Sequence, residues 1–549
     1  MEFKKNQIVE LYIDDIGNEG EGIGHIDGYA LFLKDAVIGD KVRAKIIKTK
    51  KNYGFARVEE VIEASKDRVS PRCSKARQCG GCTLQHLAYE KQLEYKFNKV
   101  KNCLERIGGL ENIEEKMEPI LGMEEPFYYR NKAQFPVGYD KEGNLITGFY
   151  AGRTHHIIDC THCMIQHPVN EQILLKVLDY MKKNNITAYD EKTHKGLVRH
   201  IVTRVGFKTG EIMVCLVVNG SKKNLRNLEM LVDSLTEVEG MTSICININK
   251  EKTNRILGSK IEEVYGKPYI YDYIGNVKYQ IGPLSFFQVN PTQTKVLYEK
   301  AMEYADLKGE ETVWDLYCGI GTISLFLAQK AKKVYGVEIV KEAIDDARLN
   351  AKMNGFDNAE FFVGKAEEVL PREYEKNGVY ADTIVVDPPR KGCDSKLLET
   401  MVKMAPKRIV YVSCDPATLA RDLKVLSEQG YEVEKVCAVD QFSHSSHVET
   451  VVLLSQQKPD DTIEIDLDLD ELDATSAELK ATYQEIKDYV LKEFGLKVSN
   501  LFISQIKRKC GIEVGENYNL PKTENPKVPQ CPKEKEDAIK AALKYFAMI

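Results

Sequence analysis

The chain has 549 residues, 43% of them hydrophobic, with 77 basic and 83 acidic side chains and a formal net charge of −6. This length exceeds one hydrophobic core, so about three or four domains are expected. No apolar run of about 18 residues exists, which predicts no transmembrane helix. The N-terminus lacks a signal-peptide core, and we therefore expect a cytoplasmic protein without a membrane partner. Fourteen cysteines then favour metal binding or catalysis over disulfides.

Short β-type runs alternate with glycine-rich turns from residue 6 onward. Their even spacing predicts a small β-barrel over residues 1–62. Basic side chains gather at its end beside two aromatic residues: Lys41, Arg43, Lys45, Lys48, Lys50, Lys51 and Arg57, with Tyr53 and Phe55. Such a mixture suits an RNA backbone and stacked bases, although a solvated barrel rim has the same composition. The segment resembles the TRAM domain, an OB-like RNA-binding barrel.

A cluster of cysteines follows the barrel. Cys73, Cys79 and Cys82 lie close together, with two glycines that let the loop fold around a bound group. This spacing predicts a metal or iron–sulfur loop, and zinc fits the sulfur ligands equally well on chemistry alone. A fourth ligand is needed, and either Cys160 or Cys163 can supply it.

Residues 63–275 are expected to form a central α+β domain that contains the cysteine loop. A helical pattern covers 89–107, and strand-like runs follow at 129–135, 196–218 and 243–249. Basic residues in these runs are candidates for an RNA path, although ordinary surface charge explains each one as well: Arg130, Lys132, Arg199, His200 and Arg204.

Strands and helices alternate over residues 276–456, which is typical of a Rossmann-like α/β domain. The strand at 313–317 runs into a glycine-bearing turn at 318–322, which lets a ligand approach the backbone. A second strand, 334–338, ends in Glu338, and an acid there suits a ribose diol. This order resembles the methyltransferases that use S-adenosylmethionine, and a domain for another nucleotide is the alternative.

Two further strands of this domain end in residues suited to chemistry. The strand 383–386 is followed by Asp387 and two prolines, a rigid turn that holds a carboxylate at the sheet edge. The strand 410–413 is followed by Cys414 and a helical segment. A helix N-terminus beside this thiol favours the nucleophilic thiolate, whereas a lone cysteine is more often part of a core.

Two short stretches complete the set of candidate residues. Phe286 and Gln288 precede the strand–helix repeat, where they can contact a base or a cofactor or simply pack at a strand end. Glu449 opens the last strand, and we expect it on the sheet edge next to Cys414. A solvated strand end is the alternative interpretation for Glu449.

The runs FFQVN, DLYCGIG, IVVDPPR, YVSCDPAT and HVET occur in this order. Together they resemble the RNA (uracil-5)-methyltransferases over about residues 1–456. The resemblance implies methylation of C5 of uridine, with Cys414 adding to C6 and Glu449 removing the C5 proton. It implies contacts to S-adenosylmethionine, and stacking on the flipped uracil by Phe286. The implied cofactor contacts are Gln288, Tyr317, Thr322, Glu338 and Asp387.

The resemblance also implies a [4Fe–4S] cluster on Cys73, Cys79, Cys82 and Cys163, with Cys160 outside the ligand set. We expect 23S rRNA as the substrate, because relatives that act on tRNA generally lack both the barrel and the cysteines. A tRNA (uracil-5)-methyltransferase and a non-catalytic RNA-binding iron–sulfur protein are the alternatives. We expect the enzyme to be a monomer.

The end of the chain departs from this pattern. An acidic linker is expected over 457–478, since residues 460–473 hold eight carboxylates and no base. A helical module is expected over 479–549, with helices at 482–494, 500–510 and 535–546, and with Ser499 as the cap of the second. That helix carries Lys507, Arg508 and Lys509, which fits nucleic-acid binding or a solvated face equally well.

Overall fold

The computed structural model describes residues 3–152, 154–457, 483–510, 512, 531–546 and 548. The chain divides into two units, Met1–Asp460 and Asp461–Ile549. No helix within the described residues is long and apolar enough to cross a membrane. Of the acidic linker expected at 457–478, all but Gln457 lies outside the described residues.

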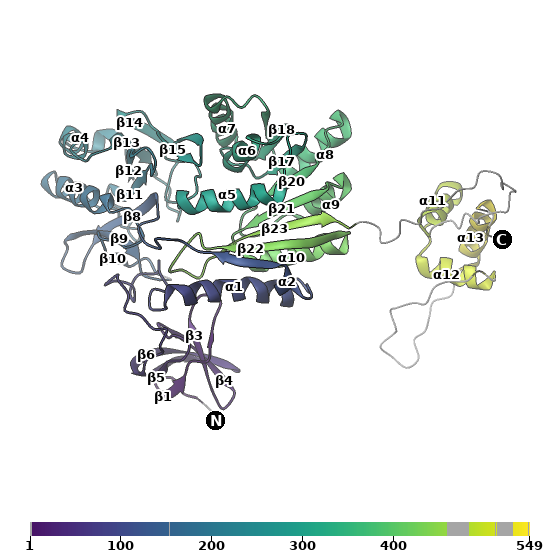
Figure 1. Ribbon diagram of the computed structural model, residues 1–549, viewed down its shortest axis with the longest axis horizontal. Helices are drawn as coiled ribbons and strands as arrows, with labels where there is room; N and C mark the ends of the chain where they lie inside the picture. The colour runs from purple at the N-terminus through teal and green to yellow at the C-terminus, as the bar shows by residue number, and fades with distance from the viewer. Residues whose placement is uncertain are drawn as a thin grey trace. The chain divides into compact units, whose positions relative to one another are not determined.

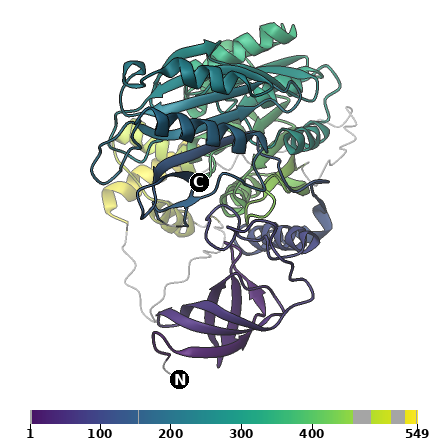
Figure 2. The same cartoon turned by 90° about the vertical axis from the view of Figure 1, so that its left-hand side faces the viewer.

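The N-terminal strands form one six-stranded sheet in the order β1-β5-β6-β4-β3-β2. The sheet curls around a small apolar core (Figure 2). Leu31 and Leu33 of β4 are buried in this core while Phe32 between them faces outward, as the period of two along a strand requires. The strands are β1 (Ile8–Tyr12), β2 (Asp15–Ile16), β3 (Gly22–Ile26), β4 (Tyr29–Lys34), β5 (Lys41–Thr49) and β6 (Tyr53–Glu63).

A seven-stranded mixed sheet forms the centre, in the order β10-β9-β8-β11-β12-β13-β14. Its strands are β8 (Lys132–Tyr139), β9 (Leu145–Tyr150), β10 (Ile157–Asp159), β11 (Val198–Val205), β12 (Ile212–Val218), β13 (Met241–Ile248) and β14 (Lys260–Gly266). Helices α3 (Val169–Lys183) and α4 (Leu228–Thr236) pack on it, and a 3-10 turn, η1, covers Lys222–Asn224. A hairpin, β15 (Ile270–Ile274) and β16 (Val277–Ile281), leads to the next sheet.

The third sheet has eight strands in the order β19-β18-β17-β20-β21-β23-β22-β7. Strands β17 to β21 pair in parallel, as expected of a doubly wound sheet, and β23 is antiparallel to β21 and β22. The strands of this sheet that follow the hairpin are β17 (Thr312–Leu316), β18 (Lys333–Glu338), β19 (Ala359–Val363), β20 (Thr383–Val386), β21 (Arg408–Ser413), β22 (Tyr431–Val439) and β23 (Glu449–Gln456).

Helices cover both faces of this sheet because its strand residues are apolar on both sides. Val410 and Val412 of β21 pack with α5 (Pro291–Ala305), α6 (Thr322–Ala328) and α7 (Lys341–Asn354). Ile409 and Tyr411 pack on the other face with α8 (Ala366–Asn377), α9 (Ser395–Met404) and α10 (Pro416–Glu428). The carboxyl ends of the parallel strands remain uncovered by these helices, which leaves the edge where ligands bind in such sheets.

A helix and a strand from far upstream complete the eight-stranded sheet. Strand β7 (Met117–Leu121) pairs in parallel with β22, and α1 (Tyr89–Arg106) packs against α10 through Val100 and Leu104. A short helix, α2 (Ile113–Lys116), joins the two. Figure 1 shows α1 between the barrel and this sheet. The sequence predicts these elements within the central domain, because a helical pattern predicts a buried face but not which sheet covers it.

The second unit contains three helices among its described residues: α11 (Tyr483–Phe494), α12 (Asn500–Lys509) and α13 (Lys533–Tyr545). They share an apolar core that includes Ile486, Ile503 and Ile539. The Ser499 hydroxyl accepts a hydrogen bond from the backbone N–H of Phe502 at 3.3 Å, as expected of a helix cap.

Candidate active site

The glycine-bearing turn after β17 has an unusual backbone. Tyr317, Gly319 and Gly321 have φ angles of +74°, +56° and +81°, and only glycine adopts such angles without strain. The N–H groups of Tyr317 and Cys318 both donate to the Val337 carbonyl, which fixes the turn against β18. The turn therefore brings its backbone close to the space above the sheet, which Tyr317, Gly319 and Ile320 line.

Carboxylates lie at or next to the carboxyl ends of three neighbouring strands around this turn. Asp315 is fully buried and accepts a hydrogen bond from the Ser324 hydroxyl at 2.5 Å, and burial raises its pKa to about 7. Burial, with Asp315 as a second cause, also raises the pKa of Asp387 to about 7. Glu338 accepts a hydrogen bond from Val340 through one oxygen only. Its second oxygen has no hydrogen-bond partner among the described residues, so it can accept from a bound hydroxyl.

Side chains from before and after the turn close the same space. Thr322 is held at the start of α6, where its hydroxyl oxygen accepts from the Tyr298 hydroxyl at 3.0 Å. Gln288 is buried, and its backbone carbonyl accepts a hydrogen bond from the Asn131 side chain at 2.9 Å. Phe286, two positions earlier, is 68% exposed. An aromatic ring this exposed gains little from its surroundings and is available for stacking.

Cys414 and Glu449 occupy matching positions on two antiparallel strands. Ser413, the last residue of β21, pairs with Thr450 of β23. Continuing this antiparallel register by one residue places Cys414 opposite Glu449. Glu449 is 3% exposed, and burial raises its pKa to about 8, with Asp387 as a further cause. Arg390 acts in the opposite direction and lowers the pKa of both Glu449 and Cys414.

The thiol of Cys414 differs from the thiolate that the sequence predicts. Burial raises the pKa of Cys414 to about 11, and the charges of Glu449 and Asp387 add to this rise. The helix that follows does not counter the effect, because Asp415 caps α10 by accepting from the N–H groups of Ala417 and Thr418. The helix N-terminus is thus satisfied by a carboxylate, and the resting cysteine is a protonated thiol.

One cavity of about 1160 Å³ joins these groups. All of the catalytic, cofactor-binding, metal-binding and base-stacking residues predicted from the sequence line it, although they come from segments spread over nearly 400 positions: Cys73, Cys79, Cys82, Cys163, Phe286, Gln288, Tyr317, Thr322, Glu338, Asp387, Cys414 and Glu449. The structure therefore brings the cysteine loop, the glycine turn and the Cys414–Glu449 pair to the wall of a single site.

The cysteines of this wall act on each other electrostatically. Burial raises the pKa of Cys82 to about 12 and that of Cys163 to about 11, and nearby cysteines contribute to both shifts. The interaction of Cys73 with Cys160 lowers the pKa of Cys73 and raises that of Cys160, whose thiol donates to the His162 carbonyl at 3.3 Å. In the part of the chain that the structure describes, no group of three or more His, Cys, Asp or Glu side chains is arranged to hold a metal ion.

The basic residues predicted for an RNA path separate into two groups. Arg130 and Lys132 line the cavity, and burial lowers the pKa of Lys132 to about 7. Arg199, His200 and Arg204 are buried in β11, all at 5% exposure or less, and so cannot form a surface path. Arg199 donates to the carbonyls of the 249–253 loop, and Arg204 donates to those of Pro283 and Ser285, next to Phe286.

Charged and titratable side chains without a role predicted from the sequence also line the cavity, Arg390, His447 and Lys365 among them. Arg390 follows the two prolines after Asp387, His447 lies two positions before Glu449, and Lys365 precedes α8. In the sequence, Arg390 is the last residue of the IVVDPPR run and His447 is the first residue of the HVET run. Their charge and position beside the predicted residues were the available signals.

The outer face of the barrel carries a cluster of aromatic rings. Phe32 of β4 lies directly opposite Phe55 of β6, and the ring of Tyr53 packs edge-on against both. Lys48 of β5 pairs with Phe55 on its other side, and Lys34 extends toward Gly152 beside the cysteine loop. We name Phe32, Tyr53 and Phe55 the barrel aromatic cluster.

Comparisons with known proteins agree with this architecture. Residues 88–457 match the family model described as tRNA (Uracil-5-)-methyltransferase, and residues 2–58 match the TRAM domain. A Clostridium tetani protein named an uncharacterized RNA methyltransferase is 53% identical over 453 residues, which is 82% of this chain and 97% of that protein. A protein of the same description from Halalkalibacterium halodurans is 52% identical over 451 residues, again 82% and 97% of the two chains.

A solved structure extends the likeness. The crystal structure of Pyrococcus abyssi tRNA (uracil-54, C5)-methyltransferase in complex with S-adenosyl-L-homocysteine has a TM-score of 0.66 and 29% sequence identity, and the match covers 81% of this chain and all of that one. The family match spans the eight-stranded sheet and every element that carries Cys414, Glu449 and the glycine turn. The chain therefore belongs to the tRNA (uracil-5-)-methyltransferase family.

Proposed function

We propose that this protein transfers a methyl group from S-adenosylmethionine to C5 of a uridine in RNA, with 23S rRNA as the substrate. The observation that carries this proposal is the pairing of Cys414 with Glu449 in the cavity that also holds the glycine turn. A nucleophile and a base opposite each other match the two roles that substitution at C5 of uracil requires.

The residues around the glycine turn fit the methyl donor. Glu338 offers a carboxylate oxygen that has no hydrogen-bond partner among the described residues, and Tyr317, Thr322, Gln288 and Asp387 line the same cavity. We assign these five residues to cofactor binding, since an acid at the end of the second strand suits a ribose diol. When bound there, S-adenosylmethionine supplies an electrophilic methyl group.

The reaction begins at the uracil ring, which Phe286 stacks against after the base leaves the RNA stack. The Cys414 thiol releases its proton to water, and its sulfur forms a bond to C6 while the C5–C6 π electrons move toward C5. Arg390 favours this step because its charge lowers the pKa of Cys414. C5 then forms a bond to the methyl carbon, and the bond between that carbon and the donor's sulfur breaks.

Glu449 completes the reaction. Its carboxylate takes the proton from C5, the electron pair restores the C5–C6 double bond, and the bond from C6 to sulfur breaks to release Cys414. A base with a pKa of about 8 is well matched to this transfer, because it holds a proton firmly and still ionises near neutral pH. The products are 5-methyluridine in RNA, the demethylated donor and one proton.

The four cysteines are proposed to hold a [4Fe–4S] cluster, with Cys73, Cys79, Cys82 and Cys163 as ligands. This proposal is supported by four sulfur groups on one cavity wall and by the glycines within the loop. The Cys160 thiol already donates to the His162 carbonyl, so we place Cys160 beside the cluster and outside its ligand set. A cluster bound by these cysteines would tie the 73–82 loop to the segment after β10.

The barrel aromatic cluster is proposed to contact RNA next to the target uridine. Its rings lie outside the barrel core, with Lys48 of β5 opposite Phe55 and Lys34 two positions after Phe32 on β4. Neither lysine has an ion pair among the described residues, so both charges remain available for phosphates. Lys34 lies near Gly152 and the cysteine loop, which leads to the cavity.

A tRNA is the second candidate substrate. The Pyrococcus abyssi tRNA enzyme matches 81% of this chain. The described residues that remain when the barrel and the second unit are left out make up a smaller share of the chain. The barrel and the cysteine loop by themselves therefore do not separate the two substrates. Purified 23S rRNA and tRNA, both free of 5-methyluridine, are incubated with the protein and S-adenosylmethionine and then mapped by mass spectrometry. Methylation of 23S rRNA alone supports the proposal. Methylation of tRNA alone favours the second candidate, and methylation of neither RNA rejects both.

A further inference from the structure

The loop between β22 and β23, residues 440–448, leads directly to Glu449. Phe442, Ser445 and His447 of this loop line the cavity. Glu449 is the first residue of β23, so its backbone is held by the sheet on one side and by this loop on the other. The position of the proposed base therefore depends on what fixes the loop.

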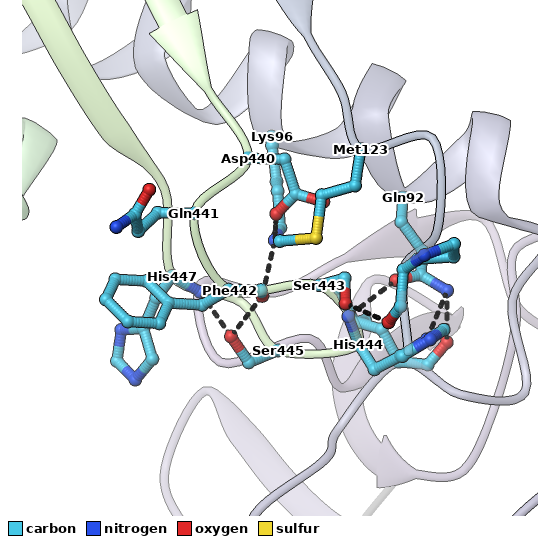
Figure 3. Close-up of polar contacts among 12 residues, drawn as sticks. Gln92, Lys96, Met123, Asp440, Gln441, Phe442, Ser443, His444, Ser445 and His447 are labelled. Atoms are coloured by element: carbon cyan, nitrogen blue, oxygen red, sulfur yellow. Dashed lines mark hydrogen bonds and ion pairs between the residues drawn. The ribbon is translucent and has the colours of Figure 1, made fainter. Parts of the chain in front are cut away.

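Helix α1 anchors the start of the loop through Lys96. The Lys96 ammonium pairs with Asp440 at 2.5 Å and donates to the Phe442 carbonyl at 2.8 Å, with both charged side chains fully buried (Figure 3). The Tyr89 hydroxyl donates to the other oxygen of Asp440 at 2.7 Å. An apolar pair would stabilise a core about as well as a buried ion pair. The contribution of the Lys96–Asp440 pair is therefore to fix the geometry of the loop.

The same face of α1 holds the middle of the loop. Gln92 accepts from the backbone N–H of His444 at 3.0 Å, and its amide nitrogen lies 3.2 Å from Nδ1 of that residue (Figure 3). The N–H groups of Thr83 and Leu84, just after the cysteine loop, both donate to the His444 carbonyl. The loop is thus tied to the cysteine segment as well as to the helix.

Lys99, seven positions after Gln92 on this face, holds the end of the loop. Its ammonium donates to the Ser446 carbonyl at 2.9 Å, three positions before Glu449. It also donates, at 2.9 Å, to the Asn18 carbonyl, which lies in the turn between β2 and β3 of the barrel. The Tyr95 hydroxyl donates to Gly17 and Asn18 in the same turn. One side chain therefore links the barrel to the segment that carries Glu449.

We propose that Lys99 is a positioning residue for proton removal: it fixes the end of the 440–448 loop to the barrel and so holds Glu449 against the methylated uracil. Lys96 performs the same task at the start of the loop. This inference rests on the proposed function, since it assigns these lysines to one step of that reaction. It also makes the position of the base depend on the position of the RNA-binding barrel.

The test separates the steps before and after methyl transfer. In RNA that carries 5-fluorouridine at the target position, C5 has no proton to remove, so addition and methyl transfer proceed and the covalent adduct with Cys414 persists. Adduct formation on this RNA, measured on a denaturing gel, reports the early steps. Turnover on ordinary RNA reports all of them.

For Lys99→Met we expect wild-type adduct formation on fluorinated RNA, and turnover on ordinary RNA reduced by roughly tenfold because the base is misplaced. Lys99→Arg restores turnover, since a guanidinium can donate to both carbonyls. Lys91→Met, which removes an exposed lysine of the same helix that pairs with Glu94, leaves both measurements unchanged.

Two results overturn the inference: unchanged turnover by Lys99→Met, or an equal loss of adduct formation and turnover, which indicates a merely structural role. If Lys99→Met does not fold, the double variant Lys96→Met with Asp440→Asn replaces it, because no buried charge is left unpaired, and the same split is expected. A wild-type protein that forms no adduct on fluorinated RNA contradicts the proposed function itself.

Discussion

Cys414 and Glu449 lie opposite each other at the point where the antiparallel pair of β21 and β23 ends. The charge of Glu449 raises the pKa of Cys414, and burial raises the pKa of both side chains. Two acids so placed resist simultaneous ionisation. The arrangement therefore favours one negative charge at a time, which suits a reaction that uses the thiolate first and the carboxylate later.

The two residues are expected to fail in different ways when they are replaced. Cys414→Ala abolishes methylation, because no group can add to C6. Glu449→Gln lets the methylated RNA adduct accumulate, because the C5 proton is not removed. Labelled RNA on a denaturing gel measures the adduct, and methyl incorporation measures turnover. Full turnover by Cys414→Ala would reject the mechanism.

Methylation is expected to depend on pH through Glu449. Its carboxylate form accepts the proton, so kcat/KM should rise as pH increases through about 8, the pKa of this buried group. Arg390 lowers the pKa of Glu449 and Cys414. Arg390→Gln should therefore shift the rising limb to higher pH, while Lys396→Gln, at an exposed position outside the cavity, should not. A limb that stays in place without Arg390 contradicts this assignment.

The stability of the fold should also respond to pH at this residue. Glu449 has a pKa of about 8 in the folded protein against an ordinary value of 4.5, so between these values the folded state holds a proton that the unfolded state has lost. Stability from this group is complete below the lower value and declines as pH rises toward 8. Glu449→Gln removes this dependence. Thermal melting should therefore show its largest gain over the wild type near pH 8.5 and little gain near pH 4.5.

Iron content is expected to distinguish two neighbouring cysteines. Cys163→Ala removes a proposed ligand, and protein purified without oxygen should lose most of its iron, sulfide and visible absorbance. Cys160→Ala is the matched control, since it removes a buried thiol of the same segment that donates to the His162 carbonyl and is not a proposed ligand. Loss of iron from the Cys160 variant alone would reverse the assignment, and one zinc without iron in the wild type would refute the cluster.

The barrel aromatic cluster is expected to act on RNA affinity. Phe55→Ala removes a stacking surface, and base stacking on an aromatic ring contributes about 1–3 kcal/mol, so KM for RNA should rise roughly tenfold with kcat unchanged. Ile8→Ala is the control, because Ile8 is 60% exposed on β1 and lies outside the cluster. Equal RNA binding by both variants would place the RNA elsewhere.

Much of the site can be predicted from the sequence because the ends of buried strands are recognisable in it. Asp387 and Cys414 each follow a short apolar run, and a parallel sheet brings such ends to one edge. Whether the basic residues of β11 are buried or exposed could not be predicted in the same way. Arg199 and Arg204 lie on a strand that is buried on both faces, and a basic residue satisfied by backbone carbonyls looks the same in sequence as one that faces RNA.

The ionisation of Cys414 was also beyond the sequence. The helix after it was predicted, but the thiol's environment depends on Glu449 and Asp387, which come from other strands. Likewise, nothing in the basic face of α1 distinguishes Lys96 and Lys99 from exposed lysines such as Lys91. Their partners, Asp440 and Ser446, are nearly 350 positions away.

Strand β7 lies at the far edge of the eight-stranded sheet, beside β22, although it precedes the whole central sheet in the chain. The central sheet is therefore an insertion within one discontinuous folding unit. A fragment that starts at the hairpin would expose the backbone amides of β22 and the apolar side of α10 that α1 covers. Truncation there would leave a seven-stranded sheet prone to aggregation, because β22 loses its partner strand and α10 loses its cover.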